Sequence, residues 1–147
     1  MKHQSGINTI INGVRYRYQK DTKTVTLFSD GFPIPGFLNI GDNVFKKTVG
    51  LNVLENSFYF VFKCRIGKHI FIVRAFLPNG ELDASTDSQD AANELKIPAY
   101  DRNEYIKTFH FSELDAIWEE RSESPDGLPF PEGLARIEYL KGGPGDL

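Results

Sequence analysis

Residues 57–77, SFYFVFKCRIGKHIFIVRAFL, constrain the fold more than any other segment of the chain. Aromatic and aliphatic side chains alternate with mixed ones on both sides of Gly67, and glycine followed by lysine suits a type II′ turn. A hairpin closed by this turn pairs Cys64 with Phe71. The pairing predicts one face that is purely apolar and belongs to the core, and an opposite face that mixes aromatic, aliphatic and basic side chains.

Further strands are predicted wherever side chains alternate with a period of two between turn signals. A second hairpin has a turn centred on Asp21 and Thr22, which pairs Tyr18 with Val25. In residues 44–54 a glycine, Gly50, indicates a bulge or bend. The predicted strands lie within residues 14–27, 44–54, 106–111 and 134–140.

Two helices are predicted in the second half of the chain. Residues 86–96 begin with a capping box formed by Thr86 and Gln89 and end before Pro98. Residues 112–123 carry large side chains at helical spacing, namely Leu114, Ile117, Trp118 and Arg121. The order of elements therefore predicts an α+β fold, with strands first and helices among the last strands.

The expected architecture is a mainly antiparallel twisted sheet of about six to seven strands, with two short helices on one side or end. The alternative is a partly closed β-barrel with helical lids. A chain of 147 residues is expected to form a single domain, 1–147, with a loose C-terminal tail at 142–147.

Several classes of protein are disfavoured by what the sequence lacks. A single cysteine, Cys64, is incompatible with an internal disulfide framework or a cysteine-based zinc site, and its parity points it into the core. His3, His69 and His110 show no ligand spacing with carboxylates. No catalytic motif appears, so we expect no enzyme activity, no cofactor and no metal. Without an apolar leader or spanning segment, the expectation is a cytoplasmic protein that does not enter a membrane.

Charge is divided unequally along the chain. Residues 1–80 hold eleven basic and four acidic side chains, whereas residues 81–147 hold six basic and sixteen acidic ones. Acidic residues gather around the second predicted helix, and such a patch favours encounter with a basic partner. The candidate partner-binding patch comprises Glu113, Glu119, Glu120, Glu123 and Asp126.

The mixed face of the 57–77 hairpin is a second candidate surface. Its aromatic side chains could stack on bases while its cations meet phosphates, as in proteins that bind single-stranded nucleic acid. This face comprises Tyr59, Lys63, Arg65, Arg74 and Phe76. The alternative interpretation is that the basic stems cover sheet surface beneath a helix.

The leading hypothesis is a non-catalytic protein-binding module. Its concrete form is an immunity or inhibitor protein that neutralises a basic partner, such as a nuclease toxin, through the acidic patch. The first alternative is a single-stranded nucleic-acid-binding sheet protein, since a nucleic-acid partner is less favoured than a protein partner. The second alternative is a small-ligand-binding domain with a pocket between helices and sheet.

Overall fold

The computed structural model describes residues 3–144. It is mostly β, with 54% of residues in strands and 11% in helices, so the predicted α+β fold with six to seven strands and two helices is wrong. Within the described residues there is one open antiparallel sheet of 12 strands. Hydrogen bonds connect ten of them in the order β4-β5-β3-β2-β1-β6-β7-β8-β10-β9, while β11 pairs with β6 and β12.

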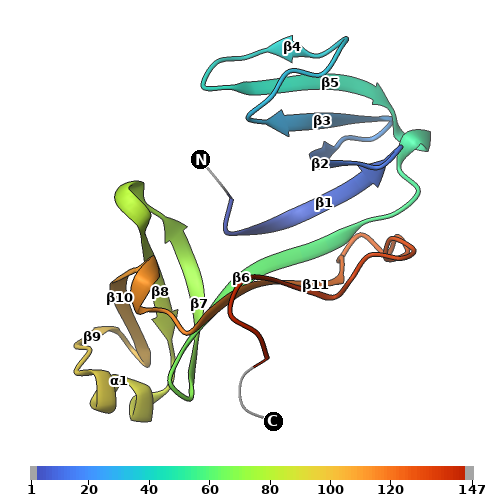
Figure 1. Ribbon diagram of the computed structural model, residues 1–147. Coiled ribbons are helices and arrows are strands. Elements are labelled where there is room, and N and C mark those ends of the chain that lie inside the picture. Colours follow the sequence, from blue (N-terminus) through green and yellow to red (C-terminus); the bar gives the residue numbers. More distant parts are fainter. Residues whose placement is uncertain (1–2, 145–147) are drawn as a thin grey trace. The chain divides into compact units, whose positions relative to one another are not determined.

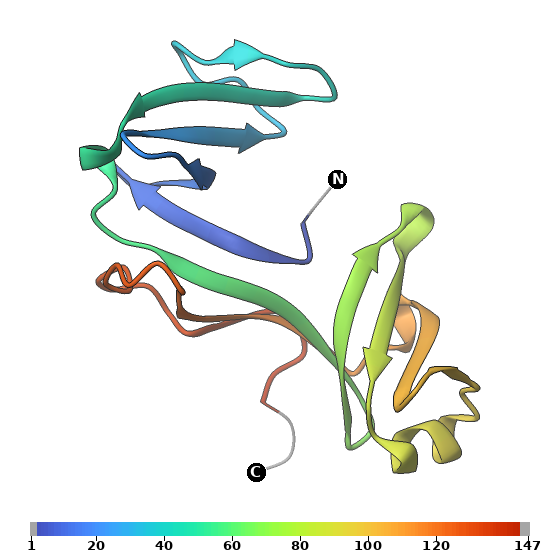
Figure 2. The same ribbon diagram turned by 180° about the vertical axis from the view of Figure 1, so that it is seen from behind.

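The strands in chain order are β1 Ser5–Ile11, β2 Val14–Lys20, β3 Thr24–Asp30, β4 Leu38–Asn39, β5 Val44–Gly50, β6 Phe58–Ile66, β7 His69–Phe76, β8 Glu81–Thr86, β9 Ala99–Asp101, β10 Glu104–His110, β11 Ala116–Glu123 and β12 Ile137–Lys141. The helical elements are the α-helix α1, Gln89–Leu95, and three 3-10 turns, η1 Leu51–Val53, η2 Pro78–Gly80 and η3 Phe111–Glu113. Figure 1 labels the α-helix and most of the strands, and Figure 2 shows the same ribbon from behind.

The chain divides into two compact units. Unit 1 comprises the residues up to Phe60 together with Arg121–Ala135, and unit 2 comprises Val61–Glu120 together with the residues from Arg136 onward. Strands β6 and β11 each contribute residues to both units. That residues 1–147 fold together as a single domain stays a prediction.

In unit 1, the core forms around Tyr16, Val25, Leu27 and Leu54, which are all buried. The β2–β3 hairpin exists, but its register pairs Tyr18 with Leu27, not with Val25 as predicted. The N–H of Asp21 donates to the carbonyl of Thr24 at 2.8 Å, so the turn is centred on Thr22 and Lys23, one position after the predicted centre. Because each partner moves by two positions, the same side chains still share one face.

In unit 2, the β6–β7 hairpin has the predicted register. Cys64 pairs with Phe71 and Lys63 pairs with Ile72. Phe62, Cys64 and Phe71 are all buried, whereas Ile72 is exposed, as the predicted parity requires.

A bulge at the end of β7 changes that parity. The β7–β8 register shifts between Val73 and Ala75, because an extra residue on β7 interrupts the alternation. Beyond it, the ring of Phe76 contacts the buried ring of Phe62 edge to face, with centroids 5.2 Å apart. Phe76 therefore lies on the core side of the hairpin and not beside Lys63.

The first predicted helix is present and the second is not. Helix α1 lies within residues 86–96, although its cap is the side chain of Ser88, which accepts from the N–H of Ala91 at 3.1 Å. Residues 112–123 instead form the end of η3 and strand β11. Consecutive residues of β11 are buried, including Ile117, Trp118 and Glu119. Because the first half of β11 is buried on both faces, it lacks the alternation that identifies strands in a sequence, whereas Glu120 further along is partly exposed.

The other predicted strands are found with different ends. The strand predicted at 44–54 stops at Gly50, where η1 begins, so this glycine ends the strand and does not form a bulge. Residues 106–111 and 134–140 correspond to β10 and β12. The predicted tail is described only as far as residue 144, and 145–147 lie outside the described residues. In the described part of the chain, no helix is both long and apolar enough to cross a membrane.

Candidate functional site

The five acidic residues of the predicted patch do not share one helix face, since the segment is a strand. Glu113, Glu119 and Glu120 belong to unit 2, whereas Glu123 and Asp126 belong to unit 1. Glu119 is buried, and the side chain of Glu113 accepts from the N–H of His110 at 2.8 Å. The carboxylates of Glu113 and Glu119 are therefore not available as parts of an exposed acidic patch.

Glu120 of the predicted acidic patch pairs with Lys63 of the predicted nucleic-acid face, so one ion pair links the two predicted surfaces. The Lys63 ammonium lies 2.7 Å from the Glu120 carboxylate, and the indole N–H of Trp118 donates to the same carboxylate at 3.3 Å. Partial burial would raise the pKa of Glu120, but the hydrogen bonds from Lys63 and Trp118 outweigh it and lower the pKa. The carboxylate of Glu120 is thus ionised at neutral pH, and its ion pair with Lys63 carries no net charge.

Around this pair four side chains lie on one face of the unit 2 sheet, because the registers of β6–β7 and β11–β12 each place one pair and the Lys63–Glu120 contact joins the two pairs. Lys63 pairs with Ile72 on β7, and Glu120 pairs with Ile137 on β12. Directly opposite residues point to the same side of a sheet. We call these four residues the outer row: Ile137, Glu120, Lys63 and Ile72.

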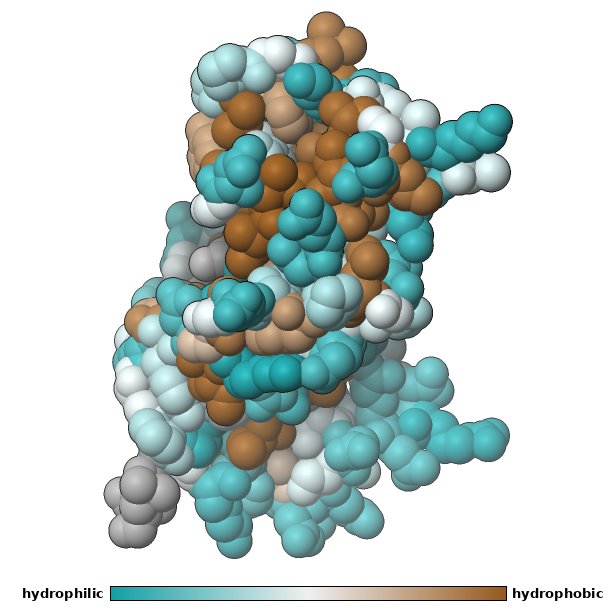
Figure 3. Space-filling model, turned by 90° about the vertical axis from the view of Figure 1, so that its right-hand side faces the viewer, coloured by the Kyte–Doolittle hydropathy of each residue, from teal (hydrophilic) through white to brown (hydrophobic). Residues whose placement is uncertain are grey.

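The isoleucines of the outer row are open to solvent. Ile72 is 44% exposed and Ile137 is 46% exposed, and Ile70, two positions along β7 on the same face, is 53% exposed. Figure 3 shows that hydrophobic side chains reach the surface in patches bordered by hydrophilic ones. Exposed isoleucines flanking an ion pair make a surface that is apolar without being charged overall.

An aromatic pair lies beside the outer row. Trp118 and Tyr139 are directly opposite on β11 and β12, and their ring centroids are 5.6 Å apart. Trp118 shares the face of Glu120, two residues away. On β6 and β7, Arg65 is directly opposite Ile70. The face thus has a second line of aromatic, basic and apolar side chains next to the first.

The basic residues of the predicted nucleic-acid face have partners within the chain. The Arg65 guanidinium donates to the carbonyl of Gly67 at 2.9 Å, and Arg74 lies 3.2 Å from Glu104. Tyr59, by contrast, belongs to unit 1. With Lys63 paired to Glu120 and Phe76 on the core side, the five predicted residues do not form one basic aromatic surface.

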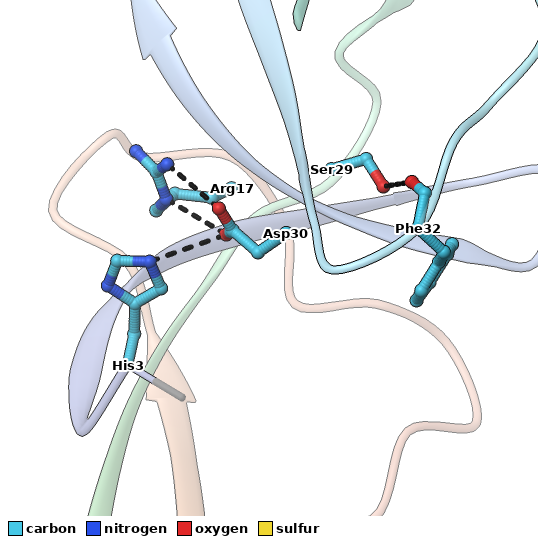
Figure 4. Close-up of polar contacts among 5 residues, drawn as sticks. All are labelled: His3, Arg17, Ser29, Asp30 and Phe32. Atoms are coloured by element: carbon cyan, nitrogen blue, oxygen red, sulfur yellow. Dashed lines mark hydrogen bonds and ion pairs between the residues drawn. The ribbon is translucent and has the colours of Figure 1, made fainter. Parts of the chain in front are cut away.

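A separate polar cluster surrounds Asp30 in unit 1 (Figure 4). Its carboxylate accepts from Arg17 Nε at 3.2 Å and Nη2 at 3.1 Å, and His3 Nε2 lies 3.4 Å away. Burial would raise the pKa of Asp30, but the Arg17 hydrogen bonds and charge outweigh it and lower the pKa. Beside it, the Ser29 hydroxyl donates to the carbonyl of Phe32 at 2.8 Å. A carboxylate held by a bidentate arginine fixes β2 and β3 together.

The other histidines also have polar partners. His69 is buried, and its Nε2 lies 2.6 Å from the Glu94 carboxylate of α1. His110 Nδ1 lies 2.8 Å from the Ser112 hydroxyl at the start of η3. No group of three or more His, Cys, Asp or Glu side chains in residues 3–144 could hold a metal ion.

Cys64 lies in the core, where burial raises the pKa of its thiol to about 12. Only the thiolate attacks disulfide reagents, so the native protein should not react with Ellman's reagent at neutral pH. We expect one thiol per chain to react after unfolding in guanidinium. Fast reaction of the native protein would contradict the buried placement, and Cys64→Ala supplies the blank.

Comparison with known proteins found no match to this chain among family models, curated proteins or solved structures.

Proposed function

We propose that this chain is a non-catalytic protein-binding module whose partner docks on the outer row. The observation that carries the proposal is the exposure of Ile72 and Ile137, 44% and 46%, on either side of the Lys63–Glu120 pair. Burying apolar side chains drives association, while a fixed pair of opposite charges sets the register of the partner. The charge pattern of the row favours a protein surface over a polyanion, because Lys63 is already neutralised.

An inhibitor of the immunity type, which would block a basic protein such as a nuclease toxin, remains a more specific proposal. It is supported by the excess of acidic side chains in residues 81–147, sixteen against six basic ones. Glu119 is buried and Glu120 is paired with Lys63, so the five residues of the predicted patch do not support this form by themselves. Its support is the overall acidic charge of residues 81–147. A basic toxin that binds only at low salt would favour this form.

The experiment compares tagged wild-type protein with the double variant Ile70→Asp/Ile72→Asp in pull-downs from the source cells. Both side chains are exposed, so the variant should fold, and a charge in the contact should remove a stoichiometric partner. Lys107→Glu is the matched control. Ile106 lies on the face of Ile72, because both residues are directly opposite Ser85 of β8, and Lys107, the next residue along β10, is exposed on the other face. Equal recovery by wild type and double variant would refute the proposal.

Binding of single-stranded nucleic acid is tested in the same set of proteins. A filter-binding assay at low salt should give no retention by wild type, because the cations Lys63, Arg65 and Arg74 have partners in the chain. Salt-sensitive retention that Lys63→Glu abolishes would favour the nucleic-acid alternative instead.

A further inference from the structure

The outer row has a pattern that is complementary to itself. From β12 to β7 it reads apolar, acidic, basic, apolar, since its members are Ile137, Glu120, Lys63 and Ile72 in that order. Reversing the row gives apolar, basic, acidic, apolar. A reversed copy laid on the original therefore opposes each acid with a base and each isoleucine with an isoleucine.

We propose that the partner of the outer row is a second copy of this chain, related by a two-fold axis. The axis lies in the interface between the two copies, parallel to the strands and above the boundary between β6 and β11. A two-fold interface brings residue i of one copy to residue j of the other, and residue j to residue i. This axis places Ile72 on Ile137 of the second copy and Lys63 on Glu120 of the second copy, twice each. The inference rests on the proposed function, because it names the partner of the same surface.

The second line of side chains on this face obeys the same symmetry. Trp118 and Tyr139 lie on the β11–β12 side, and Arg65 and Ile70 lie on the β6–β7 side. The axis brings Arg65 toward the aromatic pair of the other copy, where Trp118 is buried and the half-buried ring of Tyr139 is the part that a guanidinium can reach. It also brings Ile70, 53% exposed, toward Tyr139. Two adjacent lines of side chains thus support one symmetry operation.

The charges favour this arrangement for a physical reason. The Lys63–Glu120 pair of each copy, closed at 2.7 Å, meets its reversed counterpart, so four charges alternate in sign at the corners of a square. Each charge then keeps its partner within the chain and gains a second one, which offsets the cost of removing the pair from water. Face-to-face sheets pack about 10 Å apart with strands nearly aligned, as this axis requires.

The test is an exchange of charges, measured by sedimentation or by light scattering after gel filtration. Wild type should be dimeric at about 100 µM, where a Kd of about 10 µM leaves most chains paired. Lys63→Glu alone and Glu120→Lys alone should each raise the dimer Kd at least about tenfold, because like charges then face each other across the axis. Mixed in equal amounts, these two variants should form a heterodimer, and the double exchange K63E/E120K should restore the homodimer.

Lys107→Glu is the control and should leave the dimer unchanged. A melting curve establishes that each variant is folded, and if a charge variant is not, Ile72→Ser tests the same contact at an exposed position. A wild type that stays monomeric, single variants that dimerise normally, or a mixture that does not assemble would each overturn the inference. The proposed function survives that result if the wild type still captures a different protein and Ile70→Asp/Ile72→Asp does not.

Discussion

Replacing Phe62 with alanine is expected to lower the free energy of unfolding by about 3–5 kcal/mol, the usual range for a phenylalanine in a packed core. Phe62 is only 2% exposed and contacts the ring of Phe76 edge to face at 5.2 Å. Alanine would leave a cavity on the core side of the β6–β7 hairpin and remove this aromatic contact. Urea unfolding followed by circular dichroism measures the change.

Ile72→Ala on the same hairpin is the matched control. Ile72 lies on the opposite face and is 44% exposed, so its truncation should cost no more than about 1 kcal/mol. Comparable losses for the two variants would contradict the assignment of interior and surface in this hairpin, on which the outer row depends.

Removing the hydroxyl of Tyr18 is expected to cost about 1–3 kcal/mol, because the substitution leaves a partly buried carboxylate short of a donor. The Tyr18 hydroxyl donates to the carboxylate of Asp126 and lies 2.6 Å from the hydroxyl of Ser57, which is fully buried. In Tyr18→Phe the carboxylate of Asp126 keeps its contact with Lys20, at 3.6 Å. Tyr59→Phe, at a more exposed tyrosine, is the control.

The same substitution should change the response to alkaline pH. Burial, followed by the hydrogen bond to Asp126, raises the pKa of Tyr18 from 10.0 to about 12. A raised folded pKa means that the contribution is complete below pH 10 and is lost as the pH rises toward 12. The stability difference between wild type and Tyr18→Phe should therefore shrink over this range. A difference that stays constant from pH 8 to pH 12 would show that Tyr18 does not titrate as described.

The sequence was most informative where one face of a strand is buried and the other is open. In β6 and β7 the alternation predicted the Cys64–Phe71 pair and the burial of Cys64. The same reasoning failed for β11, where Trp118 and Glu119 are both buried and the spacing of large residues imitated a helix. Burial on both faces comes from neighbouring strands that the local sequence does not reveal.

The candidate surface was predicted only in part, for a similar reason. Lys63 was assigned to one surface and Glu120 to another, because they are 57 positions apart and were expected on different kinds of element. Their ion pair depends on the pairing of β6 with β11, which is a long-range property of the sheet. The bulge after Val73, which turns Phe76 inward, likewise has no glycine or proline to announce it.

The ends of the main strand path bear on how copies of this chain could meet. The path begins at β4, two residues long, and finishes at β9, three residues long. β4 covers only two residues of β5, and β9 covers only two residues of β10, so residues 47–50 and 106–110 form the longer open edges of the path. These edges carry Lys47 and Lys107, and charged side chains on an edge, lysine above all, discourage the addition of further strands. β12, which pairs with β11, is a further edge of the sheet outside the main path. It carries Glu138 and Lys141, and these charged side chains discourage strand addition in the same way. Assembly of this protein should therefore stop at a closed, countable complex.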